Sequence, residues 1–399
     1  MDYVHRFDFV DTELDSLRQQ GLYRRLRILM AQQGPTTTID GKKVINLSSN
    51  NYLGLTTHPK LCAAAKKAID DWGVGTGAVR TIIGTMAIHE ELEKKLAAFK
   101  HSEAALVFQS GFTANAGVLG PLLGEGDLVI SDELNHASII DGVRLTKAER
   151  AIYPHLDMAV LEQRLQEAQA TGHKKVVVVT DGVFSMDGDI APLDKIAALC
   201  QKYGAISMVD DAHASGVLGK NGRGTVNHFG LDGKWDIQVG TLSKAIGAMG
   251  GYVATNQKLR ELMQHRARPF LFSTSHPPSV VATCIAALDV LQSAEGEALI
   301  ARMWDNTAFF KKELQRLGFN TGVSQTPITP VIVGEGALVM KLSDELFAAG
   351  VFAQGIVFPT VARDKGRVRT IVTATHTKQE LEQALEAFGK VGKKLGIVR

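Results

Sequence analysis

Lys244 stands in a sequence context that suits covalent chemistry. It ends the tetrapeptide TLSK at 241–244, which follows an apolar, strand-like run at 235–240 and precedes a glycine-rich stretch at 247–254. In an open α/β sheet the carboxyl ends of the strands line the ligand crevice, so a lysine at a strand exit can point into a pocket. A lysine amine has an ordinary pKa of about 10.4 and becomes useful when a carbonyl captures it as a Schiff base. Lys244 is therefore a candidate nucleophile, although most lysines are solvated surface residues.

Polar residues also follow other runs that the sequence predicts to be strands. These candidates share a place at a predicted strand exit: Ser110, Gly111, His136, Ser185, Asp210 and His213. Taken singly, each has another interpretation. Asp210 fits a helix N-cap, the two histidines fit partly buried, hydrogen-bonded residues, and the serine at 185 fits a turn. No third residue with suitable spacing accompanies Asp210 and His213, so we expect no metal site.

Taken together, the same residues meet the needs of pyridoxal 5'-phosphate (PLP). This cofactor requires a lysine for its aldehyde, a carboxylate facing its pyridine nitrogen, and an anion site for its phosphate. Lys244, Asp210 and the Ser110–Gly111 turn can supply these three, because the first N–H groups of a helix attract anions. The planar ring of His136 suits the face of the cofactor, and His213 suits its ring hydroxyl.

The elements that position these residues alternate between apolar strands and helices. The run at 175–180 (KVVVVT) is typical of a parallel strand buried on both faces. We expect a doubly wound α/β domain with a mainly parallel sheet over 51–285 and a smaller α+β domain over 286–399. A helical arm that continues to about residue 30, followed by a hairpin turning at Asp40–Gly41, is predicted for 1–50.

Composition and charge limit the kinds of binding partner and the cellular location that we expect. A formal net charge of +2 gives no reason to expect nucleic acid or an anionic membrane as partner. The three cysteines are far apart in the sequence and show no C-x-x-C spacing, which predicts neither a zinc site nor a disulfide framework. The acidic N-terminus does not resemble a secretory signal, and no apolar run approaches the roughly 20 residues that span a bilayer. We expect a cytoplasmic protein.

Several motifs resemble those of the α-oxoamine synthase family of PLP enzymes. They cover nearly the whole chain and are NNYLGL (50–55), SGF (110–112), DELNHASIIDG (132–142), DGVFSMDGD (181–189), VDDAHASGVLG (209–219), GTLSKAIG (240–247) and RVRTIVTATHT (367–377). The resemblance implies PLP fold-type I, the aspartate aminotransferase-like fold, and a homodimer with its active sites at the subunit interface.

The resemblance also implies roles for single residues. Lys244 would hold the cofactor and act as the base, Asp210 would pair with the pyridine nitrogen, His136 would stack on the ring, and His213 would bond the ring hydroxyl. The remaining implied cofactor residues are Gly111, Phe112 and Thr241 at the phosphate, Ser185 as a support, and Ser273 and Thr274 from the partner subunit. Asn50 and Arg369 would bind the substrate carboxylate, a task that suits the planar fork of arginine. Arg367 lies two positions away, and spacing alone does not separate the two arginines.

Within the family, the motifs resemble first the glycine C-acetyltransferases, also called 2-amino-3-ketobutyrate CoA ligases, and next the 8-amino-7-oxononanoate synthases. The first resemblance implies that glycine and acetyl-CoA condense to 2-amino-3-oxobutyrate and CoA. The second implies that alanine and a pimeloyl thioester condense with loss of the carboxylate. An aminotransferase and a non-catalytic scaffold subunit are further alternatives, which the full set of motifs disfavours.

Overall fold

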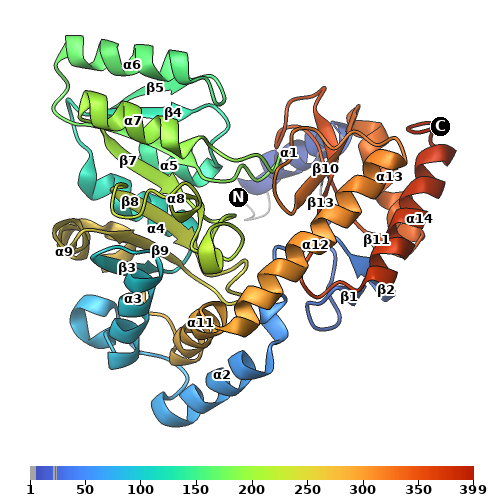
Figure 1. Cartoon of the computed structure of the whole chain (residues 1–399), viewed down its shortest axis with the longest axis horizontal. Coiled ribbons are helices and arrows are strands. Elements are labelled where there is room, and N and C mark those ends of the chain that lie inside the picture. Colours follow the sequence, from blue (N-terminus) through green and yellow to red (C-terminus); the bar gives the residue numbers. More distant parts are fainter. Residues whose placement is uncertain (1–5, 21–22, 24) are drawn as a thin grey trace.

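The computed structural model describes residues 6–20, 23 and 25–399, and its largest element is a seven-stranded, mainly parallel sheet (Figure 1). Its strand order is β3-β9-β8-β7-β6-β4-β5, and β9 runs antiparallel to both of its neighbours. The strands are β3 (Ala104–Phe108), β4 (Leu128–Asp132), β5 (Glu149–Tyr153), β6 (Val176–Asp181), β7 (Ile206–Asp210), β8 (Ile237–Thr241) and β9 (Gly251–Thr255).

Both faces of this sheet are covered by helices, which explains why its central strands are apolar throughout. In β6, Val177 and Val179 pack in the core under one set of helices, and Val178 packs in the core on the opposite face. The first face carries α4 (Gly111–Leu122), α5 (Ala137–Arg144), α9 (Gln257–Arg266) and α10 (Arg268–Leu271). The other face carries α2 (Pro59–Trp72), α3 (Ala87–Phe99), α6 (Met158–Thr171), α7 (Leu193–Tyr203), α8 (Thr225–His228) and α11 (Pro278–Leu291).

The C-terminal part is built on a smaller antiparallel sheet, as the sequence predicts. Its order is β10-β13-β12, with strands β10 (Ile328–Gly334), β12 (Gln354–Ile356) and β13 (Gly366–Ile371). The helices around it are α12 (Ala294–Arg316), α13 (Gly336–Ala348) and α14 (Lys378–Lys394). Figure 1 shows α12 running from the large sheet's side of the molecule to this smaller one.

A hairpin from the beginning of the chain joins the C-terminal part. Strands β1 (Thr36–Ile39) and β2 (Lys42–Asn46) are antiparallel, and the predicted turn has φ angles of 48° at Asp40 and 79° at Gly41. Both angles are positive, as a type I′ hairpin turn requires. Strand β2 then pairs in parallel with β11 (Val351–Phe352) and its side chains enter the C-terminal core. The hairpin is therefore held by residues from the far end of the chain.

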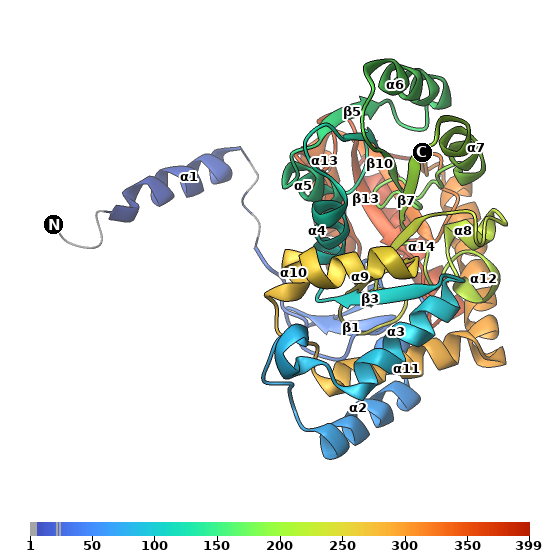
Figure 2. The ribbon, with the colours of Figure 1, turned by 90° about the vertical axis from the view of Figure 1, so that its left-hand side faces the viewer.

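The N-terminal helix is shorter than the sequence predicts. Helix α1 (Asp8–Gln19) ends ten residues early, and Leu29 instead forms a bridge with Ile39. The sequence has a glycine at position 21, a residue type that costs about 1 kcal/mol in a helix interior and therefore weakens the prediction of a longer helix. Residues 1–5, 21, 22 and 24, which belong to the predicted helix, lie outside the described residues of the structure. None of the residues of α1 is buried, and Figure 2 shows the helix standing away from the rest of the chain.

The remaining elements of the chain are short. Strand β5 is an edge strand that the sequence did not predict, and the segment after α2 contains a π-helical turn, η3 (Arg80–Gly84). The 3-10 turns are η2 (Leu55–Thr57) and η4 (Lys220–Gly222). Among the described residues, no helix combines the length and the apolar character that crossing a bilayer requires.

Candidate active site

The carboxyl ends of strands β3, β6, β7 and β8 bring several candidate residues to one edge of the sheet. Asp181 and Asp210 are paired in register at the ends of β6 and β7. Gly251 in β9 lies opposite both Thr241, the last residue of β8, and Phe108, the last residue of β3. The turns that leave β3, β6, β7 and β8 carry Ser110, Ser185, His213 and Lys244, so these four candidates lie at the same edge of the sheet.

Lys244 is half-buried among charged side chains. Burial lowers the pKa of its amine to about 8, and the positive charge of Arg369 acts in the same direction. The carboxylates of Asp210 and Asp181 oppose this shift. A lysine with this pKa is neutral in a useful fraction near neutral pH, which is the form that attacks a carbonyl.

Asp210 is buried and held by two donors. Its Oδ2 accepts from the Asn115 amide at 2.8 Å, and its Oδ1 accepts from the backbone N–H of Ala212 at 2.9 Å. The neighbouring Asp181 accepts from the backbone N–H of His136 at 2.7 Å. Burial and the charge of Asp210 raise the pKa of Asp181 well above its usual range. Asp210 is thus a buried carboxylate fixed by two donors, and its charge acts on Lys244.

His136 and His213 differ in burial and in their hydrogen-bond partners. The ring of His136 is exposed, and its Nδ1 lies 2.7 Å from the Ser138 hydroxyl. His213 is buried, and its Nδ1 lies 2.8 Å from the hydroxyl of Tyr52. Burial lowers the pKa of His213 well below its usual range, and the charge of Lys244 adds to this shift. His213 is therefore a neutral imidazole.

Arg369, Asn50 and Ser185 meet beside this group. The guanidinium of Arg369 donates to Asn50 Oδ1 at 3.4 and 3.5 Å and to the carbonyl of Ser185 at 2.5 Å. Arg367 instead donates to Asp187 at 2.5 Å and to the carbonyl of Met186 at 3.0 Å. The geometry separates the two arginines where spacing did not: Arg369 is the one whose charge reaches Lys244.

The Ser110–Gly111 turn opens helix α4. The Ser110 hydroxyl accepts from the backbone N–H of Thr113 at 3.1 Å and so caps the helix. Gly111 and Phe112 are its first two residues, so their N–H groups have no acceptor within the helix. A Cβ at Gly111 would lie 3.4 Å from the Thr241 Cβ, which places Thr241 at the same turn. This arrangement fits an anion such as the phosphate of PLP.

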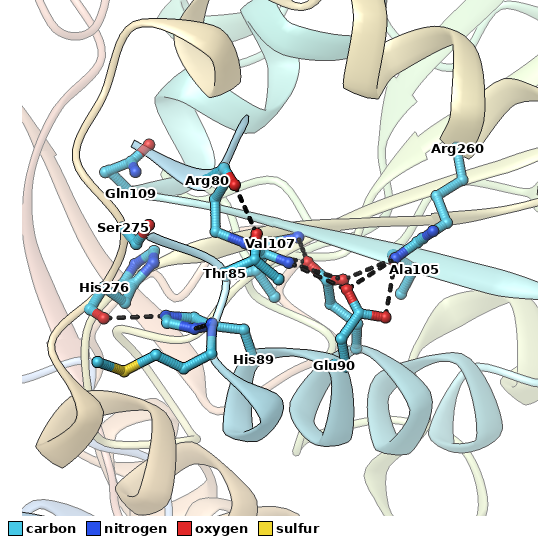
Figure 3. Close-up of polar contacts among 12 residues, drawn as sticks. Arg80, Thr85, His89, Glu90, Ala105, Val107, Gln109, Arg260, Ser275 and His276 are labelled. Carbon is cyan, nitrogen blue, oxygen red and sulfur yellow. Dashed lines mark hydrogen bonds and ion pairs between the residues drawn. The ribbon is translucent and has the colours of Figure 1, made fainter. Parts of the chain in front are cut away.

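The segment with Ser273 and Thr274 lies next to this turn within the same chain. The side chain of Gln109 donates to the Thr274 carbonyl at 2.8 Å, and Ser275 donates to the carbonyl of Ala78. Figure 3 shows the ion pairs that anchor this region. The assignment of Ser273 and Thr274 to the partner subunit's phosphate site stays a prediction.

Arg80 and Arg260, which Figure 3 shows on either side of Glu90, both also pair with Glu93, which is buried in α3. Its carboxylate accepts from Arg80 at 2.8 Å, from Arg260 at 3.0 Å and from the backbone N–H of Val107 at 3.1 Å. Because Val107 lies in β3, this group fixes the strand that ends at the Ser110 turn.

His155 joins the loops that carry His136 and Ser185. Its Nδ1 lies 3.0 Å from Asp132 and its Nε2 lies 2.7 Å from Asp189. Burial alone would lower the pKa of His155, but the hydrogen bonds to both carboxylates raise it to about 10. The imidazolium therefore bridges the end of β4 and the loop after β6.

Sequence reasoning missed four residues at this site, namely Tyr52, Asn115, Ser138 and Asp181. Asp181 carried the clearest signal, because it ends a β-branched run as Asp210 ends the next strand. Tyr52 lies inside the quoted motif at 50–55. Across residues 6–20, 23 and 25–399, no three His, Cys, Asp or Glu side chains gather in a way that could hold a metal ion.

A family model described as aminotransferase class I and II matches residues 42–388. Among curated proteins, the chain is 58% identical to an 8-amino-7-oxononanoate synthase of Thermoanaerobacter pseudethanolicus over all of both chains. It is 60% identical to an enzyme of the same name from Symbiobacterium thermophilum, over 98% of this chain and 99% of that one. These relatives do not support the expectation that the chain stands nearest to the glycine C-acetyltransferases.

Solved structures agree with this family. A serine palmitoyltransferase from S. paucimobilis superposes with a TM-score of 0.92 at 32% identity, covering both chains completely. An 8-amino-7-oxononanoate synthase from Francisella tularensis superposes with a TM-score of 0.75 at 29% identity, over 88% of this chain and 98% of that one. The chain therefore belongs to the α-oxoamine synthases of the aminotransferase class I and II family, acyltransferases of PLP fold-type I whose cofactor is pyridoxal 5'-phosphate.

Proposed function

We propose that this protein is an 8-amino-7-oxononanoate synthase. In this reaction the Cα of alanine forms a bond to the acyl carbon of a pimeloyl thioester, and the thiol and the alanine carboxylate, as carbon dioxide, are released. The observation that carries the proposal is the identity of 56–60% over 98–100% of the chain to several enzymes of that name. The proposed reaction replaces the condensation of glycine with acetyl-CoA that the motifs first indicated.

The chain's own residues have defined tasks in this proposal. PLP supplies an aldehyde that captures an amine and a ring that accepts electrons. Lys244 holds the cofactor and, once released, takes the α proton of the amino acid on its Nζ. Asp210 faces the pyridine nitrogen, and His213 bonds the ring hydroxyl. These tasks suit a buried carboxylate and a neutral imidazole.

The substrate and the phosphate have separate sites. Arg369 and Asn50, which already contact each other, bind the amino acid carboxylate. The N–H groups of Gly111 and Phe112, with Thr241, hold the phosphate. His136 covers the face of the cofactor, for which its exposed ring is free.

The structure contains a cavity of about 660 Å³, a volume that suits a long acyl chain. Ser48 and Ser49, which directly precede Asn50, line it together with apolar side chains such as Met340 and Phe352. Arg25 also lines it and offers a positive charge to the free carboxylate of a pimeloyl group. An acetyl group would leave most of this space empty.

The proposal includes a homodimer with its active sites at the subunit interface. Ile82 and Ile83 in η3 are 79% and 77% exposed, and Phe272 is 69% exposed. These residues lie near Ser273 and Thr274, because Val79 and Thr274 form a β-bridge. Exposed apolar side chains that gather in this way mark interaction surfaces.

The test is a matrix of amino acids against acyl-CoA chain lengths, read by CoA release. We expect alanine with pimeloyl-CoA to give a kcat/KM at least tenfold above every other pair, and carbon dioxide to be released in equal amount. A preference for glycine with acetyl-CoA, without carbon dioxide, would overturn the proposal and restore the other reaction. PLP removed by dialysis should abolish turnover, and its return should restore it.

A further inference from the structure

Asn115 is a polar residue in the most apolar part of helix α4. Its neighbours Ala114, Ala116, Val118 and Leu119 pack in the core, and Asn115 itself is completely buried. An amide in such a place costs about 1–3 kcal/mol when its hydrogen bonds are missing. The partners of Asn115 therefore decide why this residue stands here.

Both partners of its amide belong to the candidate active site. Asn115 Nδ2 lies 2.8 Å from Asp210 Oδ2 and 2.9 Å from Ser138 Oγ. Since an ionised carboxylate only accepts, the NH₂ group and not the amide oxygen must face Asp210. One nitrogen thus uses its two hydrogens on two different elements, the end of β7 and the first turn of α5.

The bond from Asn115 to Ser138 determines which atom donates in the bond between Ser138 and His136. Ser138 Oγ accepts from Asn115 and has a single hydrogen to donate, and His136 Nδ1 lies 2.7 Å away. The backbone N–H of Ser138 also points at this nitrogen, at 3.2 Å. An imidazole nitrogen that receives two donors carries no proton. The proton of neutral His136 is therefore on Nε2.

We propose that Asn115 is a positioning residue that fixes the Asp210 carboxylate with one N–H and, through Ser138, fixes the orientation and tautomer of His136 with the other. Asp210, which would face the pyridine nitrogen, and His136, which would stack on the ring, are thereby held by one buried side chain. The tautomer follows from the contacts alone, and the effect on the cofactor rests on the proposed roles of Asp210 and His136.

The test uses Asn115→Leu, which keeps the branched shape and removes both donors. We expect this variant to bind PLP at least about tenfold more weakly and to shift the pH midpoint of the bound cofactor's visible absorbance, because the carboxylate loses a charge-assisted hydrogen bond. Ser138→Ala removes only the branch to His136, so its loss of PLP affinity should be smaller. PLP affinity is measured by equilibrium titration of the apoenzyme.

Val118→Ala is the matched control, since Val118 lies in the same helix and is buried in the hydrophobic core. It should lower the unfolding midpoint and leave PLP affinity and absorbance unchanged. If Asn115→Leu binds PLP as the wild type does, the proposal is wrong. A Ser138→Ala loss as large as that of Asn115→Leu would overturn the carboxylate half of it.

A second measurement is made on the unsubstituted residues Asn115 and Ser138, so it depends neither on the folding of their variants nor on the reaction. In ¹⁵N-histidine-labelled apoenzyme, NMR reports which ring nitrogen of His136 carries the proton, with His136→Gln identifying the signals. We expect the proton on Nε2. A proton on Nδ1 would overturn the arrangement, whereas failure of the alanine and pimeloyl-CoA assay would leave it standing.

Discussion

At the residue scale, the chemistry depends on the Lys244 amine, whose pKa is brought close to neutral pH by opposing electrostatic effects. Burial and Arg369 lower the pKa of Lys244, while Asp210 and Asp181 limit the shift, which leaves the pKa at about 8. Removing either carboxylate would lower this pKa further, and removing Arg369 would raise it. Arg369 thus acts on the lysine as well as on the substrate in the proposed mechanism.

The pKa of Lys244 predicts how fast the apoenzyme captures PLP. Only the neutral amine attacks an aldehyde, so the rate should rise about tenfold per pH unit below pH 8 and level off above it. Stopped-flow absorbance between pH 6 and pH 9.5 measures this rate. Lys244→Ala should capture no cofactor covalently and show almost no turnover. A rate that keeps rising to pH 9.5 would mean that the pKa is the ordinary one of about 10.4.

At the element scale, buried ion pairs hold the strand ends in place. Glu93 links helix α3 to β3 through Val107 and to two arginines, of which Arg80 is almost completely buried. His155 likewise links the end of β4 to the loop after β6, through ion pairs with Asp132 and Asp189. In both cases charge inside the fold fixes a turn that carries a site residue.

Glu93→Ala should lower the free energy of unfolding by about 3–5 kcal/mol, because it removes the buried partner of the Arg80 guanidinium and leaves it only the longer contact with the half-exposed Glu90. Denaturant unfolding measures this loss. Lys67→Ala, which breaks an exposed pair with Asp71, is the control and should leave the unfolding midpoint unchanged. Equal effects from both variants would contradict a special role for Glu93.

The sequence predicts the elements that have a strong apolar pattern. Strand β6 is an example, because its valines are buried on both faces. Strand β5 is not predicted, because only Tyr153 of its five residues is buried and the segment lacks an apolar pattern. It is a strand because it pairs with β4. At the site, sequence motifs locate Lys244 and Asp210, but the contacts of Asn115 depend on how two helices and a strand pack. Spacing along the chain cannot supply that information.

At the scale of the whole molecule, the apolar surface at η3 predicts how two chains associate. Ile82→Asp combined with Ile83→Asp should convert a dimer to a monomer and remove activity, because two charges would have to be buried in the interface. Sedimentation velocity measures the change in mass. The control is Val323→Asp, at an exposed valine of the C-terminal part, which should leave the dimer intact. A doubly substituted protein that remains an active dimer would place the interface elsewhere.

The pairing of β2 with β11 also has a consequence for how the protein is made. The hairpin at 36–46 leaves the ribosome about 300 residues before the strand that completes its sheet. At about 5–20 residues per second, the hairpin waits about 15–60 s with an unpaired strand edge. The C-terminal core, which includes Ile45 and Leu47 from the beginning of the chain, can close only after synthesis is nearly finished.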